Sequence, residues 1–596
     1  MKILDKISIS LQNIFSLDLR SIAIFRISLG ILMLFDSLSR YRDAYAHLTD
    51  YGILPRSVLN TDLSNVYSFS LSNISGELLF QQLLLIFTIL MSVFLIFGYR
   101  VKLTSFILWI LTLSFQNRNP QILHASDQLL RQMLFMAIFL PTGYYFSLDS
   151  KRPKYKTNDY RNKNYFGLIT VLAYLQIVFL YLFAGLYKTS NDWSINGNAI
   201  YYMLSAQQFS IGISNFLLNL KQLYPIYSIA GFFVHKLELF GTLLFFIPFK
   251  NKLFKTIAIL SFLIFHLFIL ITMNIAPFAI ADIVFLILFV PTNVIEFIKN
   301  LKLKYIKKIN KTKKPQKVEF ISVSSQYFNI YKFLINVFVL NKDNFKILNS
   351  KINGIEVKTD KGVYKNREVI NVLISNKLLI KLINLLINTV TRFRIIKSLV
   401  IKLLNLANKS NYLNKEPNNP FDFLKNISTN LILLISIVII CFWNYATYIE
   451  NSNTWKLLPR QFYNIALLFK LEQKWNMFSP GPPHSSEWYK VIGKTNSGRD
   501  VDVLNNSIEI SQDINIADTF IDYRWQKYLL NLSAQSNEKF RFYYSQYLCR
   551  QWQIDHSDPK LALSTLKINY FQEQTALQGE QKNKTTETMI YSYKCN

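Results

Sequence analysis

Long apolar stretches recur through the first half of the chain and return once after a polar interval. A helix that crosses a membrane needs about 20 mostly apolar residues. The first stretch is not a cleavable signal, because Arg26 and Asp36 interrupt it and no small-residue cleavage site follows. The pattern predicts an all-α polytopic membrane bundle of about nine helices, with spans near 19–38, 78–98, 103–116, 128–146, 166–187, 226–248, 254–273, 276–293 and 429–447.

Changes in the pattern divide the chain into four regions. Residues 1–298 hold about eight spans, and 299–428 form a basic insertion, expected in the cytoplasm. The ninth span, 429–447, precedes residues 448–596. In this last region, strands are predicted on both sides of the turn sequence at 496–498 and again at 565–570 and 585–593, with helices at 525–532 and 540–552. We expect a small extracytoplasmic α+β domain there.

Residues 370–409 of the insertion carry a helical polar stripe. Lysine, arginine, asparagine and serine recur there mostly at steps of three and four, while Leu, Ile and Val fill the other faces. A basic amphipathic helix of this kind can lie on an anionic membrane surface. The alternative is a compositionally biased insertion without a specific role.

Charge supports a membrane protein and not a nucleic-acid-binding one. The net charge is +30, yet only 17% of residues are charged, against roughly 25% in soluble domains. Residues 301–428 hold 25 Lys and Arg against 7 Asp and Glu, beside the apolar segments. Basic residues in short loops mark the cytoplasmic side of a membrane. They place the N-terminus in the cytoplasm, and an odd number of spans then places the C-terminal domain outside.

Ionisable side chains interrupt several spans, where they are costly and usually face the bundle interior. They allow two interpretations. In the first, the acids in the spans are neutralised by Arg26, Arg131 and Lys236, and this pairing fixes helix packing. Asp127 and Arg131 lie one helical turn apart, which favours a local pair. Alternatively, the set lines a polar pocket that opens outward and contains Lys188 as a base. The set comprises Arg26, Asp36, Asp127, Arg131, Lys188, His235, Lys236, Glu238, His266 and Asp282.

Several other chemistries lack their sequence signatures. The histidines are scattered without the spacing of a metal site, so we expect no metal. Phosphate-binding loops and nucleophile elbows do not occur. Cys549 and Cys595 fall in the same C-terminal region, and the sequence leaves open whether they pair.

Short motifs in a fixed order resemble the HTTM (horizontally transferred transmembrane) family, which shares its membrane domain with vitamin K-dependent γ-carboxylase. The resemblance covers about 1–297 and 429–596, including motifs of bacterial HTTM proteins, but not the basic insertion. The motifs are Phe25–Gly30 with Asp36, Arg40 and Asp43, Tyr51–Arg56, Asn117–Asn119, Asp127–Arg131, Pro141–Gly143, Ala184–Lys188, Asp192–Trp193, Gly197, His266, Pro277–Phe278, Asp282, Gln473–Pro480 and Arg524–Tyr528.

The resemblance implies an oxygen-dependent chemistry. In the carboxylase, a lysine deprotonates a reduced quinol, and oxygen addition then yields a base that removes a γ-proton from a glutamyl side chain. Carbon dioxide adds to the carbanion, and the quinol leaves as an epoxide. Lys188 matches that lysine, and His124 lies near the position of an assisting histidine, although Ser126 and Asp127 are alternatives. We expect Trp193, Arg131 and His266 to bind the cofactor, and Arg26, Asp36, Asp127, Glu238 and Asp282 to form a polar pocket.

The function predicted from these features is a quinol-linked carboxylase or epoxidase in the bacterial inner membrane. Its expected partners are the lipid bilayer, an isoprenoid quinol of the menaquinone or vitamin K type, oxygen, carbon dioxide and an extracytoplasmic protein or peptide substrate. The alternatives are a transporter, or an anchor that presents residues 448–596. If the protein is an enzyme, we expect a cavity with Lys188 at its wall. If it is a transporter, we expect a polar path across the membrane, and if it is an anchor, we expect the polar groups to be closed into ion pairs.

Overall fold

The computed structural model describes residues 10–63, 69–152, 163–301, 318–324, 346–350, 355–359, 362–365, 420–450, 459–510, 516–577, 580 and 585–595. The chain forms two compact units. The first comprises Met1–Thr142, Asn162–Pro291 and Asn419–Asn596, and the second comprises Gly143–Arg161 and Thr292–Asn418. The amphipathic helix predicted over 370–409 lies outside the described residues.

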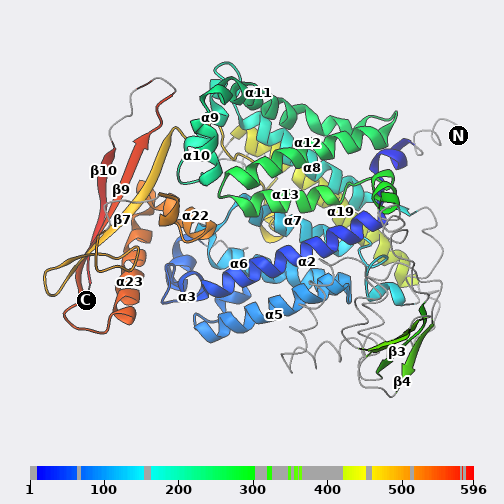
Figure 1. Cartoon of the computed structure of the whole chain (residues 1–596), viewed down its shortest axis with the longest axis horizontal. Coiled ribbons are helices and arrows are strands. Elements are labelled where there is room, and N and C mark those ends of the chain that lie inside the picture. The colour runs from blue at the N-terminus through cyan, green and yellow to red at the C-terminus, as the bar shows by residue number, and fades with distance from the viewer. Residues whose placement is uncertain are drawn as a thin grey trace. The chain divides into compact units, whose positions relative to one another are not determined.

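Apolar helices form most of the first unit (Figure 1). They follow the apolar stretches of the sequence because a helix satisfies its own backbone hydrogen bonds, as a membrane requires. Their bounds are α2 Leu19–Arg42, α3 Ala44–Leu48, α4 Arg56–Val58, α5 Leu78–Phe97, α6 Val101–Arg118, α7 Ala125–Phe139, α8 Leu168–Tyr187, α9 Ala199–Ser205, α10 Gly212–Asn219, α11 Tyr224–Phe240, α12 Asn251–Thr272, α13 Ala276–Ile287, α19 Pro420–Glu450 and α21 Arg460–Leu468.

Fewer helices than predicted are suited to cross a membrane. Within the described residues, six helices are long and apolar enough, or seven if Ala276–Ile287 and Thr292–Leu301 form one bent span. The expected spans near 103–116 and 128–146 do form the helices α6 and α7, but α7 has only 15 residues and α6 ends in the polar sequence Gln116–Arg118. The described residues therefore contain six or seven candidate spans, against about nine predicted from the sequence. The span predicted near 429–447 is confirmed within α19.

The C-terminal part of the first unit is an antiparallel sheet with two helices. The strands lie in the order β10 (Thr586–Lys594), β9 (Leu563–Gln574), β7 (Ser485–Thr495) and β8 (Asp500–Asp502). The hairpin of β7 and β8 pairs Ile492 with Asp502, which confirms the predicted turn. The predicted helices are α22 (Tyr523–Leu532) and α23 (Glu538–Asp555), and a disulfide joins Cys549 on α23 to Cys595 after β10.

This sheet and its helices pack directly onto loops of the bundle. One buried apolar cluster includes Ile53, Leu54 and Ile122 from the bundle together with Trp525 and Tyr528 of α22. Figure 1 shows α22 and α23 beside α3. Asp522 fixes the start of α22, because its carboxylate accepts hydrogen bonds from the backbone N–H groups of Arg524 and Trp525.

The second unit contains a small sheet that the sequence pattern did not predict. Its strands are β3 (Val318–Ser324), β4 (Lys346–Ser350), β5 (Ile355–Thr359) and β6 (Gly362–Lys365), in the order β4-β3-β5-β6. The strand β3 runs parallel to β4 and antiparallel to β5. The basic composition of this region concealed short alternating segments such as Ile355–Thr359.

Candidate functional site

A cavity of about 900 Å³ lies within the first unit. Its walls come from α7, α8, α9, α11, α12, α13, the segment 474–483 and α22, and most of its lining side chains are apolar. Six of the ten residues predicted to form a site line this one cavity: His124, Arg131, Lys188, Trp193, Glu238 and His266. The remaining four, Arg26, Asp36, Asp127 and Asp282, are not among its lining residues.

Lys188 and Glu238 form a buried ion pair at the cavity wall. Lys188 follows the last residue of α8, and its Nζ donates to Glu238 Oε1 over 2.9 Å. The two residues are only 6% and 4% exposed. Lys188 Nζ also lies 5.1 Å from the centre of the Trp193 ring. The pair therefore places a proton donor and a proton acceptor at the edge of an apolar space.

The close approach of α8 and α11 depends on Gly185. A Cβ atom at this position would lie 2.9 Å from the Leu239 side chain and 3.1 Å from its backbone nitrogen. Glycine therefore lets α11 come near enough for Glu238 to reach Lys188 at the end of α8. The motif Ala184–Lys188 thus supplies both the close contact and the charged group.

Trp193 holds the segment after α21 against the cavity. Its indole Nε1 donates to the Phe478 carbonyl over 3.2 Å, and the residue is 1% exposed. Its neighbour Asp192 is 2.9 Å from Nε2 of His484, whose ring stacks on Tyr202. These contacts join two motifs that are almost 300 residues apart in the sequence.

His266 lies deep in the cavity wall. Its Nε2 is 2.8 Å from the hydroxyl of Tyr181, and the same nitrogen is 3.9 Å from Asp282 Oδ1. Tyr181 stacks on Phe262, which fixes the ring next to the histidine. Asp282 thus lies next to His266 without a hydrogen bond to it, and it is not among the lining residues of the cavity.

His124 and Arg131 contact the segments that follow the bundle. Nε2 of His124 bonds to the backbone carbonyl of Tyr523, and burial lowers the pKa of His124 to about 4, so its ring is neutral at pH 7. Arg131 donates to the carbonyls of Lys470 and Glu472 over 2.9 and 2.7 Å. Both side chains therefore attach this part of the cavity wall to segments that follow the bundle.

The predicted local pair between Asp127 and Arg131 does not form. Asp127 accepts a hydrogen bond from the His124 backbone N–H, which turns its carboxylate toward the start of α7. There it meets Arg40 Nη2 at 2.7 Å and Arg524 Nη2 at 3.1 Å. The helix start and two guanidinium groups thus bind this carboxylate more favourably than a residue one turn along the same helix.

Asp36 belongs to the same charge cluster. It is 2.8 Å from Arg40 Nε and also contacts Arg524. Two carboxylates and two guanidinium groups therefore meet where the bundle joins α22. The interpretation of internal pairing holds for these acids, but with partners other than Arg26, Arg131 and Lys236. The fully buried Arg26 instead donates to the Thr142 carbonyl over 2.9 Å, and Lys236 lies over the Phe232 ring.

Sequence reasoning gave no site role to Lys527, which also lines the cavity from α22. Burial lowers the pKa of Lys527, and no ion-pair partner for it lies within the described parts of the chain. Lys474 lines the same region. The motif Arg524–Tyr528 could have indicated a site role for Lys527, because positions 524 and 527 lie on adjacent turns of one helix.

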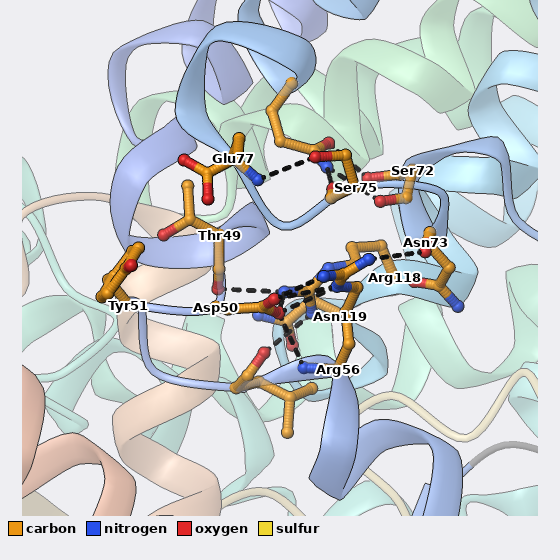
Figure 2. Close-up of polar contacts among 12 residues, drawn as sticks. Thr49, Asp50, Tyr51, Arg56, Ser72, Asn73, Ser75, Glu77, Arg118 and Asn119 are labelled. Atoms are coloured by element: carbon orange, nitrogen blue, oxygen red, sulfur yellow. Dashed lines mark hydrogen bonds and ion pairs between the residues drawn. The ribbon is translucent and has the colours of Figure 1, made fainter.

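Two further motifs meet away from the cavity (Figure 2). Arg118 is fully buried and donates to the carbonyls of Leu54 and Thr49 over 2.8 and 2.9 Å. Arg56 binds both carboxylate oxygens of Asp50. The motifs Tyr51–Arg56 and Asn117–Asn119 therefore fix the loop that supports the C-terminal domain.

The helices and the cavity define a polytopic membrane protein with an internal site. Residues 16–293 match the model of the HTTM domain, which is the domain found in vitamin K-dependent γ-carboxylase. The chain is therefore an integral membrane protein with an HTTM domain. A comparison with curated proteins and a comparison with solved structures each find no match.

Proposed function

We propose that the cavity binds a reduced isoprenoid quinol of the menaquinone or vitamin K type and that Lys188 acts as its base. The observation that supports this most is the Lys188–Glu238 pair at the wall of a mostly apolar cavity of about 900 Å³, inside an HTTM domain. Ligand sites typically combine apolar walls with a few convergent polar groups. A quinol needs this combination, because its tail is apolar and its hydroxyls are polar.

Glu238 provides a way for Lys188 to become a base. An amine accepts a proton only when it is neutral. Proton transfer from Lys188 Nζ to Glu238 Oε1, across 2.9 Å, leaves both groups uncharged. In an apolar site the neutral pair costs less desolvation than two ions. The free amine then faces the cavity and can take the quinol hydroxyl proton.

A bound quinol would supply the four electrons that reduce dioxygen, two on oxidation to the quinone and two on epoxidation. The overall reaction balances when quinol, oxygen, a C–H substrate and carbon dioxide give quinone epoxide, water, the carboxylated product and one proton. Trp193 and His266 also line the cavity, and they hold its walls in place through bonds to Phe478 and Tyr181. The enclosed site keeps bulk water from a reactive base.

The second substrate would arrive from the side of the C-terminal domain. Lys527 and Lys474 give this part of the cavity wall a positive charge. Glu238, the one acid among the described lining residues, is paired with Lys188. Such a surface attracts a carboxylate on a protein or peptide. The disulfide between Cys549 and Cys595 supports an oxidising, extracytoplasmic compartment for this domain, with the N-terminus in the cytoplasm.

One observation favours a second function, a membrane anchor that presents the C-terminal domain. Asp36 and Asp127 of the bundle bind Arg524 of α22 and are also paired with Arg40, so the domain is held in one orientation by buried charges. An anchor needs this attachment but not the cavity. The two functions therefore differ in whether quinol is consumed.

The test is quinol turnover by the purified full chain in proteoliposomes, with mass spectrometry of quinone epoxide. We expect Lys188→Ala to abolish turnover. The control is Lys236→Ala, which removes a lysine of α11 that does not line the cavity. Turnover by Lys188→Ala at the rate of the unmodified protein would exclude Lys188 as the base. Absence of turnover in the unmodified protein would favour the anchor.

A further inference from the structure

The cavity is bordered by two helices that face lipid. Both α11 and α12 lie within candidate membrane spans, Lys221–Phe246 and Asn251–Thr272. They contact each other and run side by side in Figure 1. Only 28% of the α12 span is buried, so most of this helix forms the outer surface of the bundle. An opening between these helices would therefore lead into the bilayer and not into water.

Two side chains both line the cavity and lie on that outer surface. Phe233 of α11 is 59% exposed and Ile264 of α12 is 67% exposed, yet both are part of the cavity wall. A lining residue with this much exposure marks a place where the cavity is open. Because both residues are apolar and lie in spans, the opening faces acyl chains.

The lining residues of both helices include exposed and buried side chains, and those of the ion pair are buried. Along α11, the lining residues change from the exposed Phe233 to the buried Leu237 and Glu238. Along α12, they change from the exposed Ile264 to the buried Ile269. The cavity thus has an apolar end at the lipid and a polar end at Lys188 and Glu238. This order matches a lipid that carries a polar head on an apolar chain.

We propose that the cavity opens to the bilayer beside Phe233 and Ile264. The isoprenoid tail of the quinol enters through this lateral portal and remains in it while the head reaches Lys188. This inference rests on the proposed function, because it assumes a quinol as the occupant. A tail that leaves through the portal stays among acyl chains, so the enclosed cavity needs to hold only the head and the first isoprene units. Residues at the portal therefore recognise the tail and not the head.

The experiment compares two quinols that share a head and differ in the tail. Equilibrium binding of radiolabelled menaquinol and of tail-less menadiol is measured on the full chain in nanodiscs, without oxygen so that no turnover occurs. Ile264→Trp narrows the portal. The control is Leu260→Trp, one turn away on the same helix, because Leu260 is 50% exposed and does not line the cavity.

We expect Ile264→Trp to bind menaquinol about tenfold more weakly, because several methylene groups of the tail lose their contacts, and to bind menadiol normally. Leu260→Trp should bind both quinols normally, and Phe233→Ala, which widens the portal, should keep or improve menaquinol binding. The portal is contradicted if Ile264→Trp binds menaquinol normally, or if this variant loses binding of menaquinol and menadiol equally. If Ile264→Trp loses only co-purified phospholipid, the opening binds membrane lipid and the proposal is wrong. If the unmodified protein binds neither quinol, the proposed function itself fails.

Discussion

The Nζ atom of Lys188 lies 2.9 Å from Glu238 Oε1, at the point where the end of α8 meets α11. Both side chains are buried, and both border the same apolar cavity. The lysine is therefore neither exposed to bulk water nor enclosed away from the cavity. This arrangement makes Glu238 part of the proposed chemistry, since it is the group that can take the lysine proton.

Glu238→Gln should lower quinol turnover about 100-fold, the usual size of a proton-transfer contribution. Glutamine keeps the size of the side chain and can still accept a hydrogen bond, but it cannot take the proton from Lys188. The measurement is kcat with quinol at saturation. Glu487→Gln in β7, which lies outside the cavity lining, serves as the control. A normal kcat for Glu238→Gln would show that Glu238 only positions the lysine.

Arg524→Ala should destabilise the protein by about 3–5 kcal/mol, because among the described residues Asp36 and Asp127 would keep Arg40 as their one cationic partner in a buried site. Denaturant unfolding in detergent measures this change. The matched control is Arg42→Ala, whose side chain is 53% exposed and pairs with Asp43 and Asp522. We expect a loss of about 1 kcal/mol or less for this variant. Equal losses would contradict a special role for the buried cluster.

Stability should fall as the pH is lowered below about 6.5, in part because of His47. Burial lowers the pKa of His47 to about 3 from its ordinary 6.5. Between these values the unfolded chain binds a proton that the folded chain does not bind, so the folded state loses up to about 1.4 kcal/mol per pH unit.

His47→Gln removes this titrating group and should reduce the pH dependence of the unfolding free energy between pH 7 and pH 5. Both proteins are compared again at pH 8, where the ring is neutral in either state and only the packing change against Trp525 remains. An identical pH dependence in the two proteins would mean that His47 becomes charged in the folded state.

Reduction of the disulfide should destabilise the C-terminal sheet. The bond joins Cys549 on α23 to Cys595 after the edge strand β10, across 46 positions of sequence. Loss of a bond of this kind typically costs about 2–5 kcal/mol. The melting temperature is measured with and without reductant, and in the Cys549→Ser variant. Cys441→Ser is the control, because Cys441 is a free thiol on α19 and its loss should leave the effect of reductant unchanged.

Part of the site could be predicted because its residues lie in short motifs. Lys188 and Trp193 were identified from local sequence, and the structure places both at the cavity. The partner of Lys188 could not be identified in this way. Glu238 is 50 residues away from Lys188. From the sequence, Arg26, Arg131 and Lys236 were equally suitable partners for Glu238.

Hydropathy, by itself, determined that this chain is a helical membrane protein, because apolar side chains and backbone hydrogen bonds both favour helices in a lipid environment. It also determined the strands and helices of the C-terminal domain, whose alternation and turn residues are local properties. Tertiary structure alone decided that Asp127 binds Arg40 and Arg524 and that Lys527 borders the cavity. Charges pair by distance in space, and that distance depends on how α22 packs against the bundle.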